Sequence, residues 1–333
     1  MAHTLVIAPS WVGDAVLSHP LLVRLKERDP QGTIDVLGPS WALPVYRRMP
    51  QVAQTLPLPF GHGDLKLGER RRFAKTLPRY DRAIVLPNSF KSALIPWFAG
   101  IPQRVGYIGE LRYGLLSDAR PLDSIALPLI AERYAALAQP RREAFARPLP
   151  EPRLRADAAS RRGTLASYGL NLERPAVVLA PGAEFGPAKR WPAAHFAELA
   201  RLTHARGFQV WLLGSKKDAG ITAEIQSLAG GVAVDLAGRT SLDEAIDLIS
   251  AASRVVTNDS GLMHVAAALD RPMAAIFGSS SPAFTPPLSA KAHIVSLQLS
   301  CSPCFKRTCP LGHTNCLVKL EPARVLAALG SDI

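Results

Sequence analysis

The stretch at residues 255–281 combines turn residues, a helix start and a histidine in a pattern that suits an anion. The β-branched run from Arg254 to Thr257 predicts a buried parallel strand. Residues 258–261 then supply turn and N-cap chemistry, and residues 262–269 predict a helix. The N–H groups at that helix start, beside Gly261 without a Cβ, favour a phosphate, and His264 lies one turn further in. An ordinary capped turn with a packed histidine explains the same spacing, so spacing alone leaves both interpretations open.

A long loop at residues 181–192 follows a predicted strand and carries Glu184, Lys189 and Arg190. A lysine in a strand-to-helix loop suits a diphosphate as a point charge. A solvated charged loop is the alternative. Trp191 and Pro192 at the start of the next helix indicate an ordered loop, which favours a functional role.

Two further turns carry polar side chains directly after predicted strands. Asp14 follows Gly13 at the start of the first predicted helix, where it is either a helix N-cap or a general base facing a cleft. From its position alone, the cap is the simpler explanation. Asn88, Ser89 and Lys91 form either a capped turn or a clamp for a phosphorylated acceptor, because all three can donate hydrogen bonds.

Four cysteines gather in one short window, C-x2-C-x4-C-x6-C, at Cys301, Cys304, Cys309 and Cys316, with His313 among them. In a cytoplasmic protein such a cluster indicates metal more often than disulfides. The ligand types would suit a structural zinc ion or an iron–sulfur centre. Buried or redox-labile thiols are the alternative, because the spacing matches no standard paired CxxC ribbon.

The elements that must position these residues alternate between strand and helix patterns. In the first half we expect strands at 4–8, 33–37, 52–59 and 82–86, and helices at 15–28, 41–49, 70–77, directly after 92, and 128–137. In the second half we expect strands at 176–180, 209–213, 254–257, 273–277 and 293–297, and helices at 156–168, 193–206, 219–228, 242–251, 262–269 and 322–329.

This alternation predicts an α/β protein with doubly wound parallel sheets. The irregular stretch from Arg141 to Arg155 is the expected linker, which divides the chain into domains at 1–155 and 156–333. Ligands of such sheets bind outside the carboxyl ends of the strands, so two facing halves would place a cleft between Asp14 and Asp259.

Composition narrows the function classes. The 333 residues are 48% hydrophobic, which is ordinary globular usage and excludes a disordered chain. No apolar run reaches membrane-spanning length, and the N-terminus lacks a basic leader, so we expect a cytoplasmic protein. The net charge of +12 favours an anionic partner, but aromatic residues, at 7%, do not interleave with basic runs, so we expect no nucleic acid.

Five motifs, in order along the chain, carry a resemblance to a known family: PSWVGD at 9–14, LPNSFKSA at 86–93, RYGLL at 112–116, PGAEFGPAKRWP at 181–192 and TNDSGLMH at 257–264. Together they resemble the heptosyltransferase II group of the ADP-heptose:lipopolysaccharide heptosyltransferases, in glycosyltransferase family 9. The resemblance implies the GT-B architecture of two Rossmann-like domains. It also implies an inverting transfer of L-glycero-D-manno-heptose from ADP-heptose to the first heptose of the Kdo–lipid A inner core, without a catalytic metal or other required cofactor. The resemblance further implies a peripheral protein that carries out this transfer at the cytoplasmic face of the inner membrane, on an anionic surface.

The resemblance also implies roles for single residues. Asp14 matches the family's loop aspartate, the base for the acceptor hydroxyl, and the acceptor side would include Ser10, Asn88, Ser89 and Lys91. The donor side would include Glu184, Lys189, Asp259, Ser260, Gly261, Leu262 and His264. The cysteine cluster is no general feature of the family and is expected to be structural at most. Three alternatives stay open: a heptosyltransferase acting at another core step, a nucleotide-sugar epimerase on the same scaffold, and a non-catalytic binding protein that keeps the fold.

Overall fold

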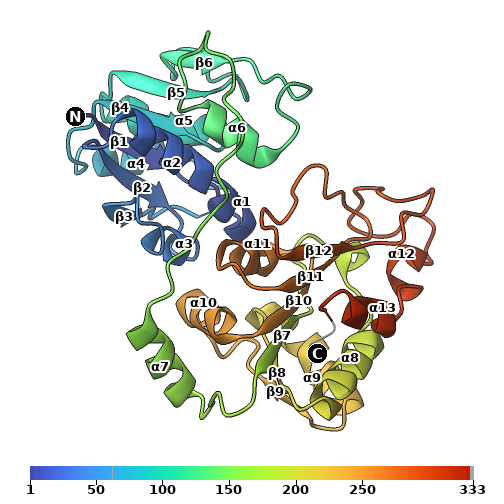
Figure 1. Ribbon diagram of the computed structural model, residues 1–333. Helices are drawn as coiled ribbons and strands as arrows, with labels where there is room; N and C mark the ends of the chain where they lie inside the picture. Colours follow the sequence, from blue (N-terminus) through green and yellow to red (C-terminus); the bar gives the residue numbers. More distant parts are fainter. Residues whose placement is uncertain (62, 331–333) are drawn as a thin grey trace. The chain divides into compact units, whose positions relative to one another are not determined.

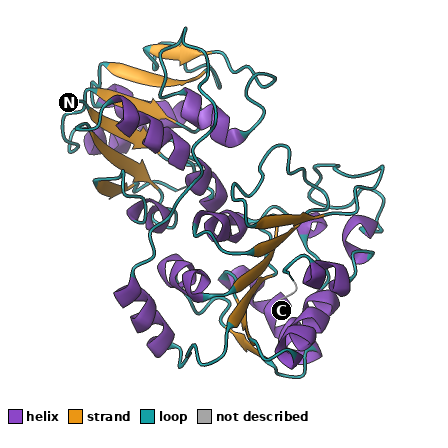
Figure 2. Cartoon of the chain, in the orientation of Figure 1, coloured by secondary structure: helices purple, strands orange, loops and turns teal. Residues whose placement is uncertain are grey.

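The computed structural model describes residues 1–61 and 63–330, which divide into two compact units, Met1–Pro152 and Arg153–Ile333. Each unit is built on one six-stranded parallel sheet (Figure 1). In the second unit, helices flank the strands on both sides (Figure 2). The predicted α/β class with two doubly wound parallel sheets is therefore confirmed.

The first unit begins at its central strand and alternates strand and helix. Its elements are β1 (His3–Ile7), α1 (Val12–Leu17), α2 (His19–Arg28), β2 (Thr33–Gly38), α3 (Leu43–Arg47), β3 (Gln54–Pro57), α4 (Leu67–Ala74), β4 (Arg82–Val85), α5 (Phe90–Phe98), β5 (Gln103–Tyr107), β6 (Asp118–Arg120) and α6 (Ile130–Ala136).

The second unit repeats this alternation after a helix. Its elements are α7 (Ala158–Ser167), β7 (Ala176–Ala180), the 3₁₀ turn η1 (Pro187–Lys189), α8 (Ala193–Ala205), β8 (Gln209–Leu212), the 3₁₀ turn η2 (Lys216–Asp218), α9 (Ala219–Leu228), β9 (Ala233–Asp235), α10 (Leu242–Ala251), β10 (Arg254–Asn258), α11 (Gly261–Ala268), β11 (Met273–Ile276), β12 (Ala292–Val295), α12 (Asn315–Val318) and α13 (Pro322–Ala327).

The two sheets share one strand order. The first sheet runs β3-β2-β1-β4-β5-β6 and the second runs β12-β11-β10-β7-β8-β9. When the strands of each unit are numbered from its own first strand, both sheets have the order 3-2-1-4-5-6, which is the order of dinucleotide-binding domains. The order reverses between the first and fourth strands, and this is the switch point of the sheet. In the first sheet that switch point lies between β1 and β4, and in the second between β7 and β10. Ligands of such sheets bind at this point, outside the carboxyl ends of the strands.

The central strands are the most buried because both faces of each sheet are covered by helices. In β7 every residue is buried, and the same holds for β11. The bounds predicted for β7, α9 and α10 are confirmed. Three strands were missed, namely β5, β6 and β9, because their short sequences lack a continuous apolar run. The predicted strand at 52–59 is only β3, and Pro57 is tolerated there because β3 is an edge strand.

The predicted helix at 15–28 is wrong in one respect that matters for the site. The chain instead forms α1 and α2, with Ser18 between them. Pro20 explains the break: proline has no N–H to donate and its ring collides with the carbonyl four residues earlier, so the first helix cannot continue through it. Because α1 already begins at Val12, Asp14 lies inside its first turn and not in the preceding loop.

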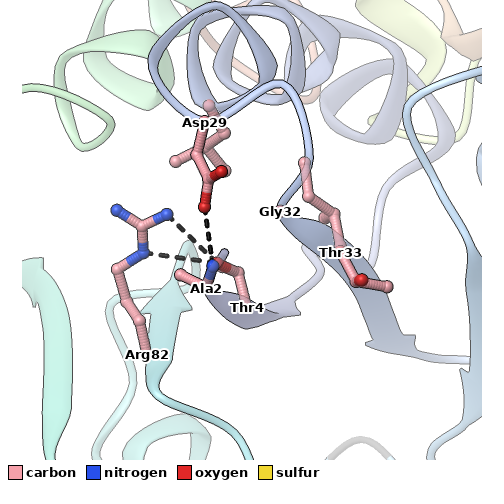
Figure 3. Close-up of a pocket in the computed structure, with 8 residues that line it drawn as sticks. Ala2, Thr4, Asp29, Gly32, Thr33 and Arg82 are labelled. Carbon is pink, nitrogen blue, oxygen red and sulfur yellow. Dashed lines mark hydrogen bonds between the residues drawn. The ribbon is translucent and has the colours of Figure 1, made fainter.

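The amino end of the first sheet is closed by polar contacts (Figure 3). The main-chain N–H of Ala2 donates to Asp29 Oδ2 at 2.6 Å, and the guanidinium of Arg82 donates to Thr4 Oγ1 at 3.0 and 3.3 Å. The shallow hollow between these residues has no internal volume that a ligand could fill. A ligand site is therefore expected at the opposite, carboxyl end of the strands.

Candidate active site

A cavity of about 370 Å³ opens at the carboxyl end of the first sheet. It is lined by residues from the loop after β1 and the start of α1, the loop after β4 and the start of α5, the end of β5, the chain after β6, and α6: Pro9, Ser10, Trp11, Asp14, Leu86, Pro87, Asn88, Ser89, Lys91, Tyr107, Leu122, Ile130, Arg133 and Tyr134. The structure thus brings the proposed base, Asp14, together with all four residues predicted for the acceptor. The cavity sits at the switch point between β1 and β4.

Asp14 is held on a short helix and does not cap it. The N-cap of α1 is Trp11, which makes no side-chain capping bond. The simpler explanation offered for Asp14, a helix N-cap, is therefore wrong. Tyr134 of α6 lines the same cavity, and burial raises the pKa of its phenol well above the ordinary value, with the charge of Asp14 adding to the rise. Tyr134 consequently stays protonated beside the carboxylate and keeps an O–H to donate.

The loop after β4 is fixed by Arg112, which is 1% exposed. Its guanidinium donates to the carbonyl oxygens of Tyr107, at 2.5 and 3.0 Å, and of Pro87, at 2.5 Å. It also donates to Asn88 Oδ1 at 3.1 Å, which leaves the NH₂ of that side chain as the group Asn88 can present. Burial lowers the pKa of Arg112 to about 10, so the guanidinium remains charged at neutral pH. A buried cation that satisfies several carbonyls gives the cavity a rigid wall.

In the second unit, the residues that could bind an anion also meet at the switch point of the sheet. Lys189 in η1, after β7, forms an ion pair with Asp259, after β10, with Nζ 2.5 Å from Oδ2. Both side chains are largely buried, at 17% and 6% exposed. Ser280, after β11, donates its Oγ–H to the same Oδ2 at 2.5 Å. Lys189 is therefore held in one orientation by a carboxylate that Ser280 in turn holds with a hydrogen bond.

Helix α11 starts at Gly261 next to this ion pair, with Ser260 as its N-cap. Ser260 does not close the helix end with its side chain, as the sequence suggested, but shares a hydrogen bond with Thr257 Oγ1 at 3.1 Å. The first N–H groups of the helix, from Gly261 and Leu262 onward, are thereby left to other acceptors. The helix dipole adds a positive potential at the same place.

His264 lies one turn into α11 and is 5% exposed. Burial lowers the pKa of its imidazole to about 4; Lys189 adds to the fall and Asp259 opposes it. Its Nδ1 has no hydrogen-bond partner among the described residues. His264 is therefore neutral at physiological pH and acts near the ion pair as a dipole and not as a third charge.

Asn258 ties the donor-side loop to the sheet. Its side chain accepts from the N–H of Trp191 at 3.1 Å and donates to the carbonyl of Pro181 at 2.7 Å. These two residues stand at the two ends of the loop that carries Lys189. Asn258 is 0% exposed, so one buried amide fixes the whole loop against β10.

Glu184 does not join the Lys189–Asp259 pair. It makes an ion pair with Lys217 on η2, after β8, and both side chains are exposed. The turn η2 also comes close to the Lys189 loop at Gly182. A Cβ on Gly182 would lie within 2.6 Å of the Asp218 carboxyl group, so this approach requires glycine. Glu184 thus lies at the same end of the sheet as Lys189 but faces a different loop.

The four cysteines are free thiols. Burial raises the pKa of Cys316, and electrostatic interaction with Cys301, Cys304 and Cys309 adds to the rise. In the part of the chain that the structure describes, however, no three Cys, His, Asp or Glu side chains converge as metal ligands. The arrangement of these thiols does not fit a structural metal as it stands.

Four residues with clear roles in these two sites were not singled out from the sequence. Arg112 lies inside one of the five motifs, which was its only signal. Asn258 also lies inside one of the motifs, where its residue type indicates only a turn, and nothing in the spacing distinguished Ser280 from an ordinary turn residue. Tyr134 had no signal, since it follows the pattern of an amphipathic helix.

Comparison with known proteins agrees with this geometry. The family model "Glycosyltransferase family 9 (heptosyltransferase)" matches residues 70–315. The chain is 50% identical to lipopolysaccharide heptosyltransferase 2 of Salmonella typhimurium and 49% identical to that of Escherichia coli, in both cases over 98% of this chain and 97% of the relative. The solved structure of E. coli ADP-heptose lps heptosyltransferase II matches with a TM-score of 0.89 at 46% identity, covering 99% of this chain and 98% of that one. The fold is therefore the GT-B fold that the sequence motifs implied, and the chain belongs to glycosyltransferase family 9, the heptosyltransferases.

Proposed function

We propose that this heptosyltransferase moves L-glycero-D-manno-heptose from ADP-heptose to the first heptose of the Kdo–lipid A inner core, with inversion at the anomeric carbon. One observation carries the proposal. At the switch point of each sheet stands the kind of group that this reaction needs, a carboxylate in a cavity on the first sheet and a held cation beside a helix start on the second.

Asp14 is the proposed base. The acceptor hydroxyl gives its proton to the Asp14 carboxylate while its oxygen forms a bond to the anomeric carbon of the donor heptose. Tyr134, protonated and in the same cavity, can donate to the sugar or to the carboxylate. Lys91 and the Asn88 amide supply further donors for a phosphorylated acceptor.

Lys189 and the start of α11 are the proposed site of the donor diphosphate. As the new bond forms, the bond between the anomeric carbon and the β-phosphate oxygen breaks, and its electron pair leaves with ADP. Lys189 offers a point charge to that developing negative charge, and the N–H groups at Gly261 and Leu262 offer preorganised donors. Asp259 and Ser280 act as positioning residues for Lys189, and Glu184 is assigned to the outer part of the same site.

The proposal requires no cofactor, because a base and a stabilised leaving group are sufficient for the transfer. A structural zinc or iron–sulfur centre at the four cysteines is a separate hypothesis, which rests on their clustering in the sequence alone. No step of the transfer passes through it.

The proposed acceptor, a phosphorylated lipid, implies where in the cell the protein acts. In the described residues no helix is long and apolar enough to cross a membrane. A net charge of +12 favours contact with a phosphorylated lipid and with an anionic leaflet. We therefore propose a peripheral protein at the cytoplasmic face of the inner membrane.

The test is incubation with ADP-heptose and two acceptors, Kdo–lipid A without heptose and Kdo–lipid A with one heptose, followed by mass spectrometry. We expect one heptose to be added to the second acceptor alone, with release of ADP. Addition to the heptose-free acceptor would assign the chain to another core step. Release of free heptose or of an epimer without any acceptor would favour an epimerase.

A further inference from the structure

The segment that carries the cysteines is packed directly onto the loop that carries Lys189. The N–H of Ala188 donates to the carbonyl oxygen of Arg307 at 3.0 Å. Gly186 is equally close, since a Cβ there would lie 2.5 Å from the same oxygen. The main chain at Arg307 therefore forms one wall of the donor loop, and a side chain larger than glycine at 186 would push the two apart.

The same segment also braces the loop after β11. Phe305 donates its N–H to the carbonyl of Ser279 at 2.7 Å, and the hydroxyl of Ser302 donates to the carbonyl of Gly278. The next residue, Ser280, is the one that donates to Asp259. The cysteine segment thus contacts both loops that orient the Lys189–Asp259 pair.

Arg307 brings a second positive charge to this place. Its guanidinium carbon lies 5.1 Å from the centre of the Phe185 ring, and Lys189 Nζ lies 5.1 Å from the same centre. The two cations are therefore no more than about 10 Å apart, which is about one Debye length at 0.1 M salt, so salt does not fully screen one charge from the other. The Arg307 side chain is exposed, and in the described part of the chain no carboxylate forms an ion pair with it.

Two cations on one aromatic ring, of which only Lys189 has a carboxylate partner, leave a net positive site. A guanidinium carries several N–H donors in one plane, which match the oxygens of a phosphate. We propose that Arg307 is a second diphosphate-binding residue of the donor site, and that the cysteine-bearing segment is part of that site. This inference rests on the proposed function, because that function supplies the diphosphate.

The test measures binding of ADP, AMP and adenosine by calorimetry. The variants are Arg307→Gln, Arg307→Lys and Lys189→Gln, with Lys306→Gln as the matched control, an exposed cation from the same segment. For Arg307→Gln we expect ADP to bind about three- to thirtyfold more weakly, as for one charged hydrogen bond at a solvent-accessible site. AMP should be affected less and adenosine not at all. Arg307→Lys should recover part of the affinity, and Lys306→Gln should bind like the wild type.

The outcomes separate this inference from the function on which it rests. If Lys189→Gln weakens ADP binding and Arg307→Gln does not, the role of Arg307 is wrong while the donor site stands. If neither variant changes ADP binding, the role of Arg307 and the proposed donor site at Lys189 are both wrong. If Arg307→Gln weakens ADP, AMP and adenosine by the same factor, Arg307 only supports the loop, and its proposed contact with the diphosphate is refuted.

Discussion

Replacing Asp14 by Asn tests the base assignment most directly, because the structure separates its effect on catalysis from its effect on the fold. The substitution keeps the size of the side chain and removes its charge and its basicity. Asp14 lies in the first turn of α1 but is not the N-cap, which is Trp11. The variant therefore loses no N-cap bond, and one interaction that it weakens is that of the carboxylate with the helix dipole.

The two expected magnitudes differ enough to be told apart. A negative charge in the first turn of a helix stabilises it by roughly 0.3–1 kcal/mol, and loss of this helix-dipole interaction should lower the free energy of unfolding by about as much. Loss of a general base lowers the rate by roughly 10²–10⁴-fold. At about 1.4 kcal/mol per factor of ten, this is roughly 3–5 kcal/mol of transition-state stabilisation. The loss of transition-state stabilisation should thus be several times larger than the loss of helix-dipole stabilisation.

The assay is the rate of ADP release with saturating acceptor, measured beside ADP affinity and urea unfolding. We expect a near-normal affinity for ADP, because Asp14 belongs to the first unit and the donor residues to the second. Tyr134→Phe is the companion variant, which keeps the carboxylate and removes the neighbouring hydroxyl. An Asp14→Asn enzyme that turns over at close to the wild-type rate would refute the reasoning, and the base would have to be sought elsewhere in the cavity.

Three further predictions concern the second unit. Lys189→Ala should weaken ADP and ADP-heptose binding alike by roughly 1–3 kcal/mol, as for a lost charged hydrogen bond; unchanged affinities in calorimetry would remove Lys189 from the diphosphate site. His264 has a pKa lowered by burial to about 4, against 6.5 in its ordinary state. Its contribution to stability is therefore complete above about pH 6.5 and is lost as the pH falls toward 4, by up to roughly 3 kcal/mol. Urea unfolding at pH 7 and pH 5 should show this loss, and His264→Asn should reduce it; an equal loss in both proteins would contradict it. If the cysteines hold a structural metal, anaerobically purified protein should contain about one zinc or an iron–sulfur centre per chain, and Cys304→Ser should lower the melting temperature. Elemental analysis without metal would end that hypothesis.

The alternation of strands and helices was readable from the sequence because buried strands and amphipathic helices have strong local patterns. The strand ending at Ala180 and the helix from Ala219 to Leu228 are examples whose bounds were predicted correctly. Strands without such a pattern were not readable. Asp118–Arg120 is a strand because it pairs with β5 in the sheet, and nothing in those three residues indicates it.

The sequence also predicted that the candidate catalytic and binding residues follow strands, but it did not predict which of them contact one another. Glu184 is an example: it stands in the same loop as Lys189, yet it pairs with Lys217 from another turn. Asp14 was assigned to a loop, but α1 begins already at Val12, so Asp14 lies in its first turn. Each of these outcomes depends on residues that are distant in the chain or on where a helix begins.

The sequence by itself determined that this protein is built of parallel sheets with polar loops at the carboxyl ends of their strands, because hydrophobic periodicity and turn residues act locally. Only the tertiary structure decided which of those loops meet. Strand order is set by how strands pair across the sheet, and that order places Asp14 on α1 beside the loop of Asn88, and Lys189 beside Asp259. The tertiary structure also decided that the buried Arg112 donates to the carbonyl oxygen of Pro87 and that Arg307 lies near the Phe185 ring. Contacts of this kind join residues far apart in the chain, and no local pattern encodes them.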